Sequence, residues 1–319
     1  QGKLDEAAAS FRKALIINSN YAEAHSNLGS VLNELGEHKK AIASHRKAIE
    51  IQPNFAEAHY NLHALLLDPK NLKPSINCLQ NAVEFNPEKV IYKFMLGVLF
   101  EYSGNTREAK RLFVYVEGGD KLDRAKLDAW RYIKSFNKSL PPIFGSSPQG
   151  FRLGLDAAKI EGLVLEFGVR FGTSIRQIAN LVDQNVHGFD SFEGLPEAWH
   201  HEPKGSYTTK GTIPNVQENV TLHVGLFEET LPEFVIKFSG PIRFINIDCD
   251  LYSSTKTVLD YLSNQIVPGT VIVFDEYIGN EHWREDEFKA FQEAVKNYGW
   301  NYKYLGFSFM SKQAIVQIL

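Results

Sequence analysis

Two different patterns of hydrophobic and polar positions divide the chain. Over about the first 118 residues, apolar positions recur three or four apart, and Gly or Pro interrupts them at regular intervals. From Leu163 onward, short apolar runs alternate with amphipathic stretches. The first pattern predicts an all-α domain, and the second predicts a mostly parallel sheet whose strands are joined by helices.

The helical part repeats itself with a period of 34 residues, so that residues 21–54 align with residues 55–88. Leu28, Leu62 and Leu96 share one phase of the repeat, and Gly or Pro residues end its helices. Small residues at the contacts would let two helices approach, and larger apolar residues would fill the space between them. The pattern is typical of stacked antiparallel helix pairs.

This repeat closely resembles the tetratricopeptide repeat, as a half repeat, two full repeats and a degenerate third unit. The resemblance implies a concave surface that binds a protein or peptide partner. Support of the second domain, or self-association into a homo-oligomer, is the alternative. The match weakens at "DPKNLKP" (residues 68–74), where the turn contains two prolines. His25 and His59 occupy equivalent positions, and we expect them to pack between helices rather than bind a metal.

A less regular segment follows the repeats. "DKLDRAKLDAWRYIKSFNK" (residues 120–138) predicts an amphipathic helix, and "SLPPIFGSSPQG" (residues 139–150) predicts a loop. "FRLGLDAAKIEG" (residues 151–162) predicts another helix before the first strand. We therefore expect repeats at residues 1–118, a helical linker at 119–150 and a second domain at 151–319.

The second domain contains seven apolar runs that predict strands: "LVLEFG", "VHGFD", "VTLHVG", "IRFINID", "TVIVFD", "NYKYLGFSF" and "QAIVQIL". Only a few residues separate the last two, so these strands must pair as an antiparallel hairpin. A mostly parallel, seven-stranded sheet with a terminal antiparallel hairpin is the methyltransferase variant of the Rossmann-like α/β fold.

The stretch "LVLEFGVRFGTSI" (residues 163–175) ends a buried strand in Glu166 and two glycines, Gly168 and Gly172. Ligands bind such sheets at the carboxyl ends of the strands, where glycines allow close backbone approach. The spacing lacks the G-x-G-x-x-G that holds a pyrophosphate, which argues against NAD. Asp190 ends the second strand, where an acid can accept both ribose hydroxyls. The alternative is that both glycines serve only a tight turn and helix packing.

Four acids end two further strands: Asp248 and Asp250 follow "IRFINI", and Asp275 and Glu276 follow "TVIVF". If these strands are neighbours, the carboxylates converge and repel unless they bind protons or a cation. Mg²⁺ suits such an oxygen-rich site, and it could hold a substrate hydroxyl while a carboxylate accepts its proton. The alternative is that Asp250 or Glu276 caps the following helix.

Charge, cysteine content and hydropathy bear on the partners and the cellular setting of the chain. A net charge of −4 without a basic face gives no reason to expect a nucleic-acid partner. Cys78 and Cys249 cannot form a disulfide framework or a thiolate metal site, which favours a reducing, cytoplasmic setting. The chain has no apolar run of the ~20 residues that cross a bilayer, and we expect no membrane partner.

The second domain, over about residues 150–319, resembles the macrocin O-methyltransferase family of class I S-adenosylmethionine-dependent enzymes. The matching stretches are "LEFGVRFGTSI", "GFDSFEGLPEAW", "GLFEETLP", "IDCDLYSSTKTVLDYL" and "VIVFDEY". The chain departs from the family where Cys249 replaces a common Gly and Glu276 replaces a common Asp.

The resemblance implies a set of binding residues. The cofactor-binding residues would be Glu166, Gly168, Thr173 and Ser174 around the methionine end, Asp190 at the ribose, Ser191 and Phe192 near the adenosine, Gly225 and Phe227 at the adenine, and also Gly172. The metal ligands would be Asp248, Asp275 and Glu276, with Asp248 as the catalytic base.

The polar segment "GLPEAWHHEPKGSYTTKGTIPN" (residues 194–215, called the lid segment) predicts a mobile lid over the cofactor. Its His200 and His201 could contact substrate or act as a base, although adjacent histidines are more often solvated. His282 is the better histidine candidate for proton transfer, ranked below Asp248. Two aromatic side chains could present flat surfaces to a sugar or could simply pack, namely Trp199 and Trp283.

Together these features predict an S-adenosylmethionine-dependent O-methyltransferase, assisted by a divalent metal, that acts on a hydroxyl of a sugar or glycosylated small molecule. One alternative is a scaffold protein whose methyltransferase domain has lost catalysis. Another is a protein methyltransferase whose repeats recruit a polypeptide substrate.

Overall fold

The computed structural model describes residues 2–136 and 139–319. The chain forms two compact units, Gln1–Ser146 and Ser147–Leu319, and the division between them falls inside the irregular segment that follows the repeats. Among the described residues, no helix is both long and apolar enough to cross a membrane.

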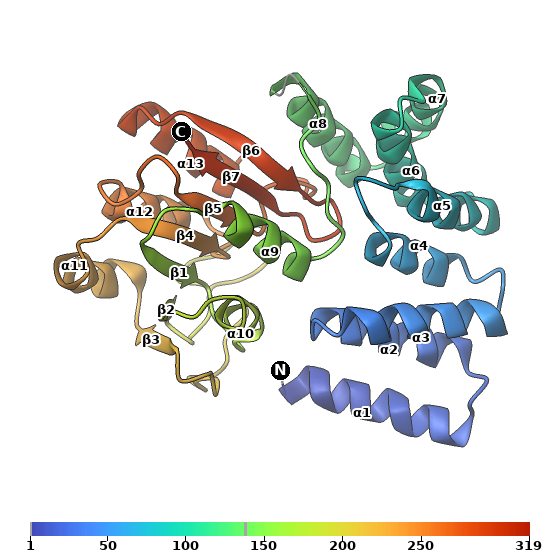
Figure 1. The fold of residues 1–319 in the computed structure, drawn as a ribbon, viewed down its shortest axis with the longest axis horizontal. Helices are drawn as coiled ribbons and strands as arrows, with labels where there is room; N and C mark the ends of the chain where they lie inside the picture. Colours follow the sequence, from blue (N-terminus) through green and yellow to red (C-terminus); the bar gives the residue numbers. More distant parts are fainter. Residues whose placement is uncertain (1, 137–138) are drawn as a thin grey trace. The chain divides into compact units, whose positions relative to one another are not determined.

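Among the described residues, all the named elements of the first unit are helices, in agreement with the periodic pattern (Figure 1). Three helix pairs, α2 with α3, α4 with α5 and α6 with α7, correspond to successive repeats and pack within each pair. The helices are α1 (Gly2–Ile17), α2 (Ala22–Glu34), α3 (His38–Ile51), α4 (Ala56–Leu65), α5 (Lys73–Phe85), α6 (Val90–Tyr102), α7 (Thr106–Glu117) and α8 (Lys121–Phe136).

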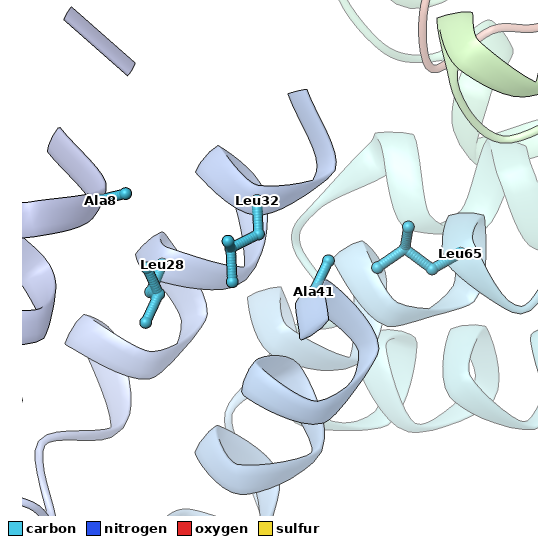
Figure 2. Close-up of a cluster of buried hydrophobic side chains, with 5 residues drawn as sticks. All are labelled: Ala8, Leu28, Leu32, Ala41 and Leu65. Carbon is cyan, nitrogen blue, oxygen red and sulfur yellow. The ribbon is translucent and has the colours of Figure 1, made fainter. Parts of the chain in front are cut away.

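Close packing inside the repeats depends on glycine. A Cβ atom on Gly29 would lie 2.7 Å from the ring of His45, and one on Gly97 would lie 2.6 Å from the ring of Phe113. In the α2–α3 and α6–α7 pairs, a glycine on the first helix therefore makes room for a ring on the second helix, whereas α4 has His63 at this position. Figure 2 shows a cluster of buried apolar side chains that come from four helices of this unit, namely Ala8, Leu28, Leu32, Ala41 and Leu65.

The two histidines at equivalent repeat positions each contact a backbone carbonyl of the turn before their helix. His25 contacts the Ser19 carbonyl oxygen through Nε2 at 3.0 Å, and His59 contacts the Pro53 carbonyl oxygen through Nε2 at 2.9 Å. Each imidazole therefore ties the start of a helix to the turn before it.

Helix α8 confirms the amphipathic helix predicted after the repeats, up to Phe136; residues 137 and 138 lie outside the described residues. Its buried Trp130 donates from Nε1 to the Glu101 carboxylate at 2.7 Å, and Lys134 forms an ion pair with the same carboxylate at 2.7 Å. Because Glu101 belongs to α6, these contacts join α8 to the helical stack.

The second unit contains the predicted seven-stranded sheet, with the strand order β3-β2-β1-β4-β5-β7-β6. Strands β1 to β5 are parallel, whereas β7 runs antiparallel to both β5 and β6. The strands are β1 (Leu163–Phe167), β2 (Val186–Asp190), β3 (Val220–Val224), β4 (Ile242–Ile247), β5 (Val271–Phe274), β6 (Tyr302–Phe307) and β7 (Ala314–Ile318).

Helices cover both faces of this sheet (Figure 1). They are α9 (Ser147–Ala157), α10 (Thr173–Ala179), α11 (Phe227–Lys237), α12 (Tyr252–Leu262) and α13 (Glu287–Tyr298). The prediction of a loop up to residue 150 was wrong at its end, since α9 begins at Ser147. Pro148 lies in the first turn of this helix, where the missing N–H costs nothing.

Successive side chains of a strand point to opposite faces of the sheet, and both faces pack against helices. Val273 points to α9, where a Cβ atom on Gly154 would lie 3.4 Å from it. Phe274, the next residue, packs against Phe291 of α13 with ring centroids 5.0 Å apart. Both faces are thus buried, and the carboxyl ends of the parallel strands meet at one edge of the sheet.

Candidate functional site

A cavity of about 360 Å³ lies at the carboxyl edge of the parallel strands, within the second unit. Segments that follow β1, β2, β3, β4 and β5 all contribute to its walls. Eight of the residues predicted from the sequence line it: Gly168, Asp190, Ser191, Gly225, Phe227, Asp248, Asp275 and Glu276.

The remaining residues predicted to bind the cofactor do not line the cavity. Glu166 is fully buried on β1, and Phe192 is 2 % exposed. Gly172 occupies the N-cap position of α10, which Thr173 and Ser174 begin. Their roles toward a cofactor remain predictions, as does the role of His282, which lies elsewhere.

The first glycine brings two functional loops into contact. Gly168 has a φ of +90°, and a Cβ atom there would lie 1.8 Å from the backbone oxygen of Asp248. The Asp248 amide also donates to the Phe167 carbonyl at 2.8 Å. Any side chain at Gly168 would therefore push the Asp248 loop away, so this glycine serves backbone packing as well as lining the cavity.

Asp190 holds the loops around it in place. One oxygen of its carboxylate accepts the Arg170 amide at 2.7 Å, and the other accepts the Phe192 amide at 2.6 Å. A carboxylate oxygen can accept more than one hydrogen bond, so both oxygens keep capacity for a ligand hydroxyl. The geometry fits the predicted binding of ribose.

Glu166 lies behind the cavity with an incomplete set of partners. Its Oε1 accepts from the Ser174 hydroxyl and from the Asn246 amide, the latter at 3.3 Å. Its buried Oε2 has no hydrogen-bond partner among the described residues. Burial raises the pKa of this carboxyl to about 8. An unpaired buried carboxylate oxygen is a suitable partner for the ammonium group of an amino-acid moiety.

The four predicted acids do converge. Asp248, Asp250, Asp275 and Glu276 all line the cavity, because β4 and β5 are neighbouring parallel strands. Burial, and next the charge of Asp275, raises the pKa of Asp248. Burial and the charge of Glu276 raise the pKa of Asp250 and that of Asp275 to about 7 each. The cluster would thus be stabilised by a cation.

The side chains that already contact the four acids offset only part of their negative charge. Gln313 donates from Nε2 to Asp275 at 2.6 Å, and the Lys312 ammonium lies 2.8 Å from Glu276. Neither Asp250 nor Glu276 occupies an N-cap, since Leu251 precedes α12 and Asp286 precedes α13. Hard carboxylate oxygens that face one cavity are a donor set that fits Mg²⁺.

A fifth acid, Glu287 (called the brace), connects the two loops that carry the cluster, and it was not identified from the sequence. Glu287 is fully buried, and its two carboxylate oxygens accept the backbone amides of Cys249 at 3.4 Å and Glu276 at 3.1 Å. It therefore joins the loop after β4 to the loop after β5. The available signal was a Glu at the start of the apolar face of α13, in phase with Phe291 and Ala294.

The lid segment forms part of the cavity wall through residues that include Leu195, Trp199 and Tyr207. Its first residues are joined to its middle by the Leu195 amide, which donates to the Ser206 carbonyl at 2.9 Å, and by the Gly205 amide, which donates to the Leu195 carbonyl at 2.9 Å. Trp199 is half-buried and lines the cavity.

The histidines and the second tryptophan lie outside the cavity lining. His200 and His282 stack with ring centroids 3.9 Å apart, and His201 is exposed. Trp283 is 2 % exposed and packs edge-on against Phe288, as the packing alternative predicts.

In the absence of divalent cations, we expect the free energy of unfolding to decrease as pH rises, because of the clustered carboxyl groups. The pKa values of Asp250, Asp275 and Glu166 in the folded protein are about 7, about 7 and about 8, above their ordinary values of 3.8, 3.8 and 4.5. Between pH ~4.5 and ~8 the folded state therefore binds more protons than the unfolded state, and the free energy of unfolding decreases.

Thermal melts at pH ~5.5 and ~8, with and without excess Mg²⁺, test this expectation. We expect Mg²⁺ to raise Tm at pH ~8 by roughly 3 °C or more, and to have little effect at pH ~5.5, where the carboxyls are protonated. The Asp275→Asn variant should lose most of this stabilisation. A Tm that rises with pH in the absence of metal would contradict the prediction.

Comparisons with known proteins agree with the two patterns. Residues 165–277 match the family model of a methyltransferase domain, and residues 1–36 and 29–68 match that of the TPR repeat. No curated protein matches the chain.

Similar solved structures fall into the same two groups. The calicheamicin methyltransferase CalS11 is 24% identical over 54% of this chain and 77% of its own, with a TM-score of 0.45. The O-methyltransferase NovP is 19% identical over 54% of this chain and 78% of its own, with a TM-score of 0.41. MamA from Desulfovibrio magneticus RS-1 is 25% identical over 36% of this chain and 64% of its own, with a TM-score of 0.32. The family-model matches alone identify a tetratricopeptide-repeat region within residues 1–68, followed by a methyltransferase domain at residues 165–277.

Proposed function

We propose that the second unit is an S-adenosylmethionine-dependent O-methyltransferase that acts, with a divalent metal, on a hydroxyl of a sugar or glycosylated small molecule. The observation that supports this most is that one cavity joins the Asp190 loop to the cluster of four carboxylates. A ribose-binding acid and a group that can activate a hydroxyl would then face the same space.

The proposed cofactor site uses the residues predicted from the sequence. The unpaired Oε2 of Glu166 would accept the ammonium group, and Asp190 would accept the ribose hydroxyls. The other residues proposed to surround the cofactor are Gly168, Gly172, Thr173, Ser174, Ser191, Phe192, Gly225 and Phe227. When bound, S-adenosylmethionine supplies an electrophilic methyl group on sulfur.

The proposed base is Asp248. Asp248 lines the cavity, and its raised pKa makes its carboxylate a better proton acceptor. The acceptor oxygen would form a bond to the methyl carbon as the carbon–sulfur bond breaks, and its proton would pass to Asp248. The residues that would hold Mg²⁺ are Asp248, Asp275 and Glu276. When bound, the metal would supply Lewis acidity that lowers the pKa of the hydroxyl.

The walls of the cavity favour a sugar hydroxyl as the acceptor. An acid-rich site activates a hydroxyl, whereas it would keep an amine protonated and unreactive. Trp199 and Tyr207 line the cavity from the lid segment, and the Arg170 guanidinium lies 5.0 Å from the Tyr207 ring centroid. Aromatic faces of this kind can pack against the apolar face of a sugar ring.

The alternative of a scaffold with a lapsed methyltransferase domain is favoured by one observation. Lys312 already pairs with Glu276, and Gln313 already binds Asp275, so an internal ammonium and an amide engage two of the proposed metal ligands. In that case the cofactor would still bind, but the acceptor would not be activated. In either case we propose that the repeats bind a protein or peptide partner.

Methyl transfer itself tests the proposal. The full chain would be incubated with S-adenosylmethionine, Mg²⁺ and a panel of sugars, glycosylated small molecules and peptides, and release of S-adenosylhomocysteine would be measured. We expect turnover with a hydroxyl compound and a mass gain of one methyl group on oxygen. Turnover with peptides alone would support the protein methyltransferase. Cofactor binding without any turnover would support the scaffold.

The buried brace beneath the cluster gives a further prediction. A Glu287→Gln variant keeps one acceptor oxygen but places an amide NH₂ against the second backbone N–H. One of the two hydrogen bonds that connect the acidic loops is therefore lost. We expect Mg²⁺ affinity, measured by calorimetry, to fall by roughly 10–100-fold. The affinity for S-adenosylhomocysteine should stay within a few-fold, because the two hydrogen bonds of Glu287 go to the loops after β4 and β5.

The matched control is Glu293→Gln in the same helix, whose carboxylate accepts the Tyr252 side-chain hydroxyl at 2.6 Å rather than a backbone amide of either loop. This variant should bind Mg²⁺ as the wild type does. Equal Mg²⁺ affinity in the Glu287→Gln variant and the wild type would show that the brace does not position the metal ligands.

A further inference from the structure

The geometry points to a transition-metal site, for Zn²⁺, formed by His200, His282 and Glu285 outside the cavity. One ligand atom of each residue lies within 4.8 Å of those of the other two. His200 belongs to the lid segment, whereas His282 and Glu285 lie between β5 and α13. The site does not depend on the proposed methyl transfer, and none of its three residues lines the cavity.

His200 is held in the manner of a metal ligand. Its Nε2 donates to Oδ2 of Asp286 at 2.8 Å, and the same oxygen accepts the Trp199 indole N–H at 3.0 Å. Asp286 is 6 % exposed and occupies the N-cap of α13, yet its side chain makes no cap hydrogen bond. An imidazole that donates from Nε2 keeps its lone pair on Nδ1. A carboxylate behind a histidine in this way orients metal-binding imidazoles.

His282 brings a second imidazole and a carboxylate to the same place. Its ring stacks on that of His200 with an interplanar angle of 15°, and its Nδ1 lies 3.3 Å from the Glu285 carboxylate. The backbone around it is fixed, since the His282 amide donates to Oδ1 of Asn280 at 2.9 Å and the His282 carbonyl accepts the Glu285 amide at 2.7 Å.

Binding requires one adjustment. An imidazole binds a metal in its own plane, so two stacked rings can share an ion only after one of them turns. The His282 side chain is 37% exposed and that of Glu285 is 66% exposed, which leaves both with room to move. Ligand atoms about 2.0–2.2 Å from a tetrahedral zinc lie roughly 3.3–3.6 Å from each other. The His282–Glu285 separation of 3.3 Å already matches this value.

The donor set and the charges favour zinc over magnesium. Two imidazoles and one carboxylate are a common ligand set of Zn²⁺, whereas Mg²⁺ prefers oxygen ligands alone. The Glu281 carboxylate lies 3.9 Å from Nε2 of His282, so it adds negative charge next to the site. A bound ion would tie the lid segment to the segment that follows β5.

Calorimetric titration of Zn²⁺ into the metal-free full chain tests the site. Excess Mg²⁺ would be present throughout to occupy the carboxylate cluster in the cavity. We expect one Zn²⁺ to bind per chain, with affinity lowered at least roughly tenfold in His200→Ala and in His282→Ala. The matched control is His201→Ala, the neighbouring exposed histidine outside the cluster, which should bind as the wild type does.

Two further measurements keep the test decisive if a variant folds poorly. Visible absorption of Co²⁺ bound to the wild type should report nitrogen and oxygen ligands, and this signal should be displaced by Zn²⁺. Glu285→Gln removes only a surface carboxylate and should weaken binding without changing Tm. The absence of zinc binding to the wild type would overturn the proposal, and so would zinc binding that is equally strong in His201→Ala, His282→Ala and His200→Ala.

Discussion

Replacement of Asp248 by Asn is expected to lower the rate of methyl transfer by roughly 10²–10⁴-fold. Asn has nearly the same shape but cannot accept the proton of the acceptor hydroxyl. The affinity for S-adenosylhomocysteine should stay within a few-fold, because the backbone contacts of this residue with Phe167 and Gly168 do not involve the carboxylate. The loss should thus appear in kcat.

Single-turnover kinetics with a saturating acceptor measure this effect. Asp260→Asn is the matched control, because Asp260 belongs to the following helix and pairs with Lys256 at its partly exposed surface. Its activity should equal that of the wild type. Full activity of Asp248→Asn would remove Asp248 both as base and as an essential metal ligand.

Replacement of Asp190 by Ala is expected to weaken binding of S-adenosylhomocysteine by at least about 100-fold. The variant loses the acceptor of the ribose hydroxyls, and it also leaves the Arg170 and Phe192 amides without their acceptor. The loops that line the cavity should therefore lose order as well. Calorimetric titration measures the loss directly.

Two further variants separate these causes. Asp190→Asn retains one acceptor oxygen and should bind the ligand more weakly than the wild type but more strongly than Asp190→Ala. Asp183→Ala changes an exposed acid shortly before the same strand and should have no effect. Wild-type affinity in Asp190→Ala would mean that the nucleoside binds elsewhere.

Much of the fold could be predicted because it depends on local patterns. The repeat period placed Leu28, Leu62 and Leu96 on equivalent helix faces, and the apolar runs marked all seven strands. Parallel strands end at a common edge, so the acids that follow β4 and β5 could be expected to meet there. The cavity lining confirms that Asp248 and Asp275 share this space.

The parts that could not be predicted depend on contacts between distant segments. Glu287 lies 38 residues from Cys249, and its hydrogen bond to that backbone leaves no trace in an amphipathic helix pattern. The stacking of His200 on His282 likewise requires the path of the lid segment, which contains no regular periodicity. Lys312 reaches Glu276 only because the turn before β7 lies beside the end of β5.

The most direct test of the account is calorimetric titration of S-adenosylhomocysteine into the wild-type chain, with and without Mg²⁺. We expect saturable binding of one molecule per chain with Kd in roughly the micromolar range. The binding should be retained without metal, because the residues proposed to hold the nucleoside do not belong to the carboxylate cluster. No binding to the folded protein under either condition would contradict the assignment of the cavity to this cofactor.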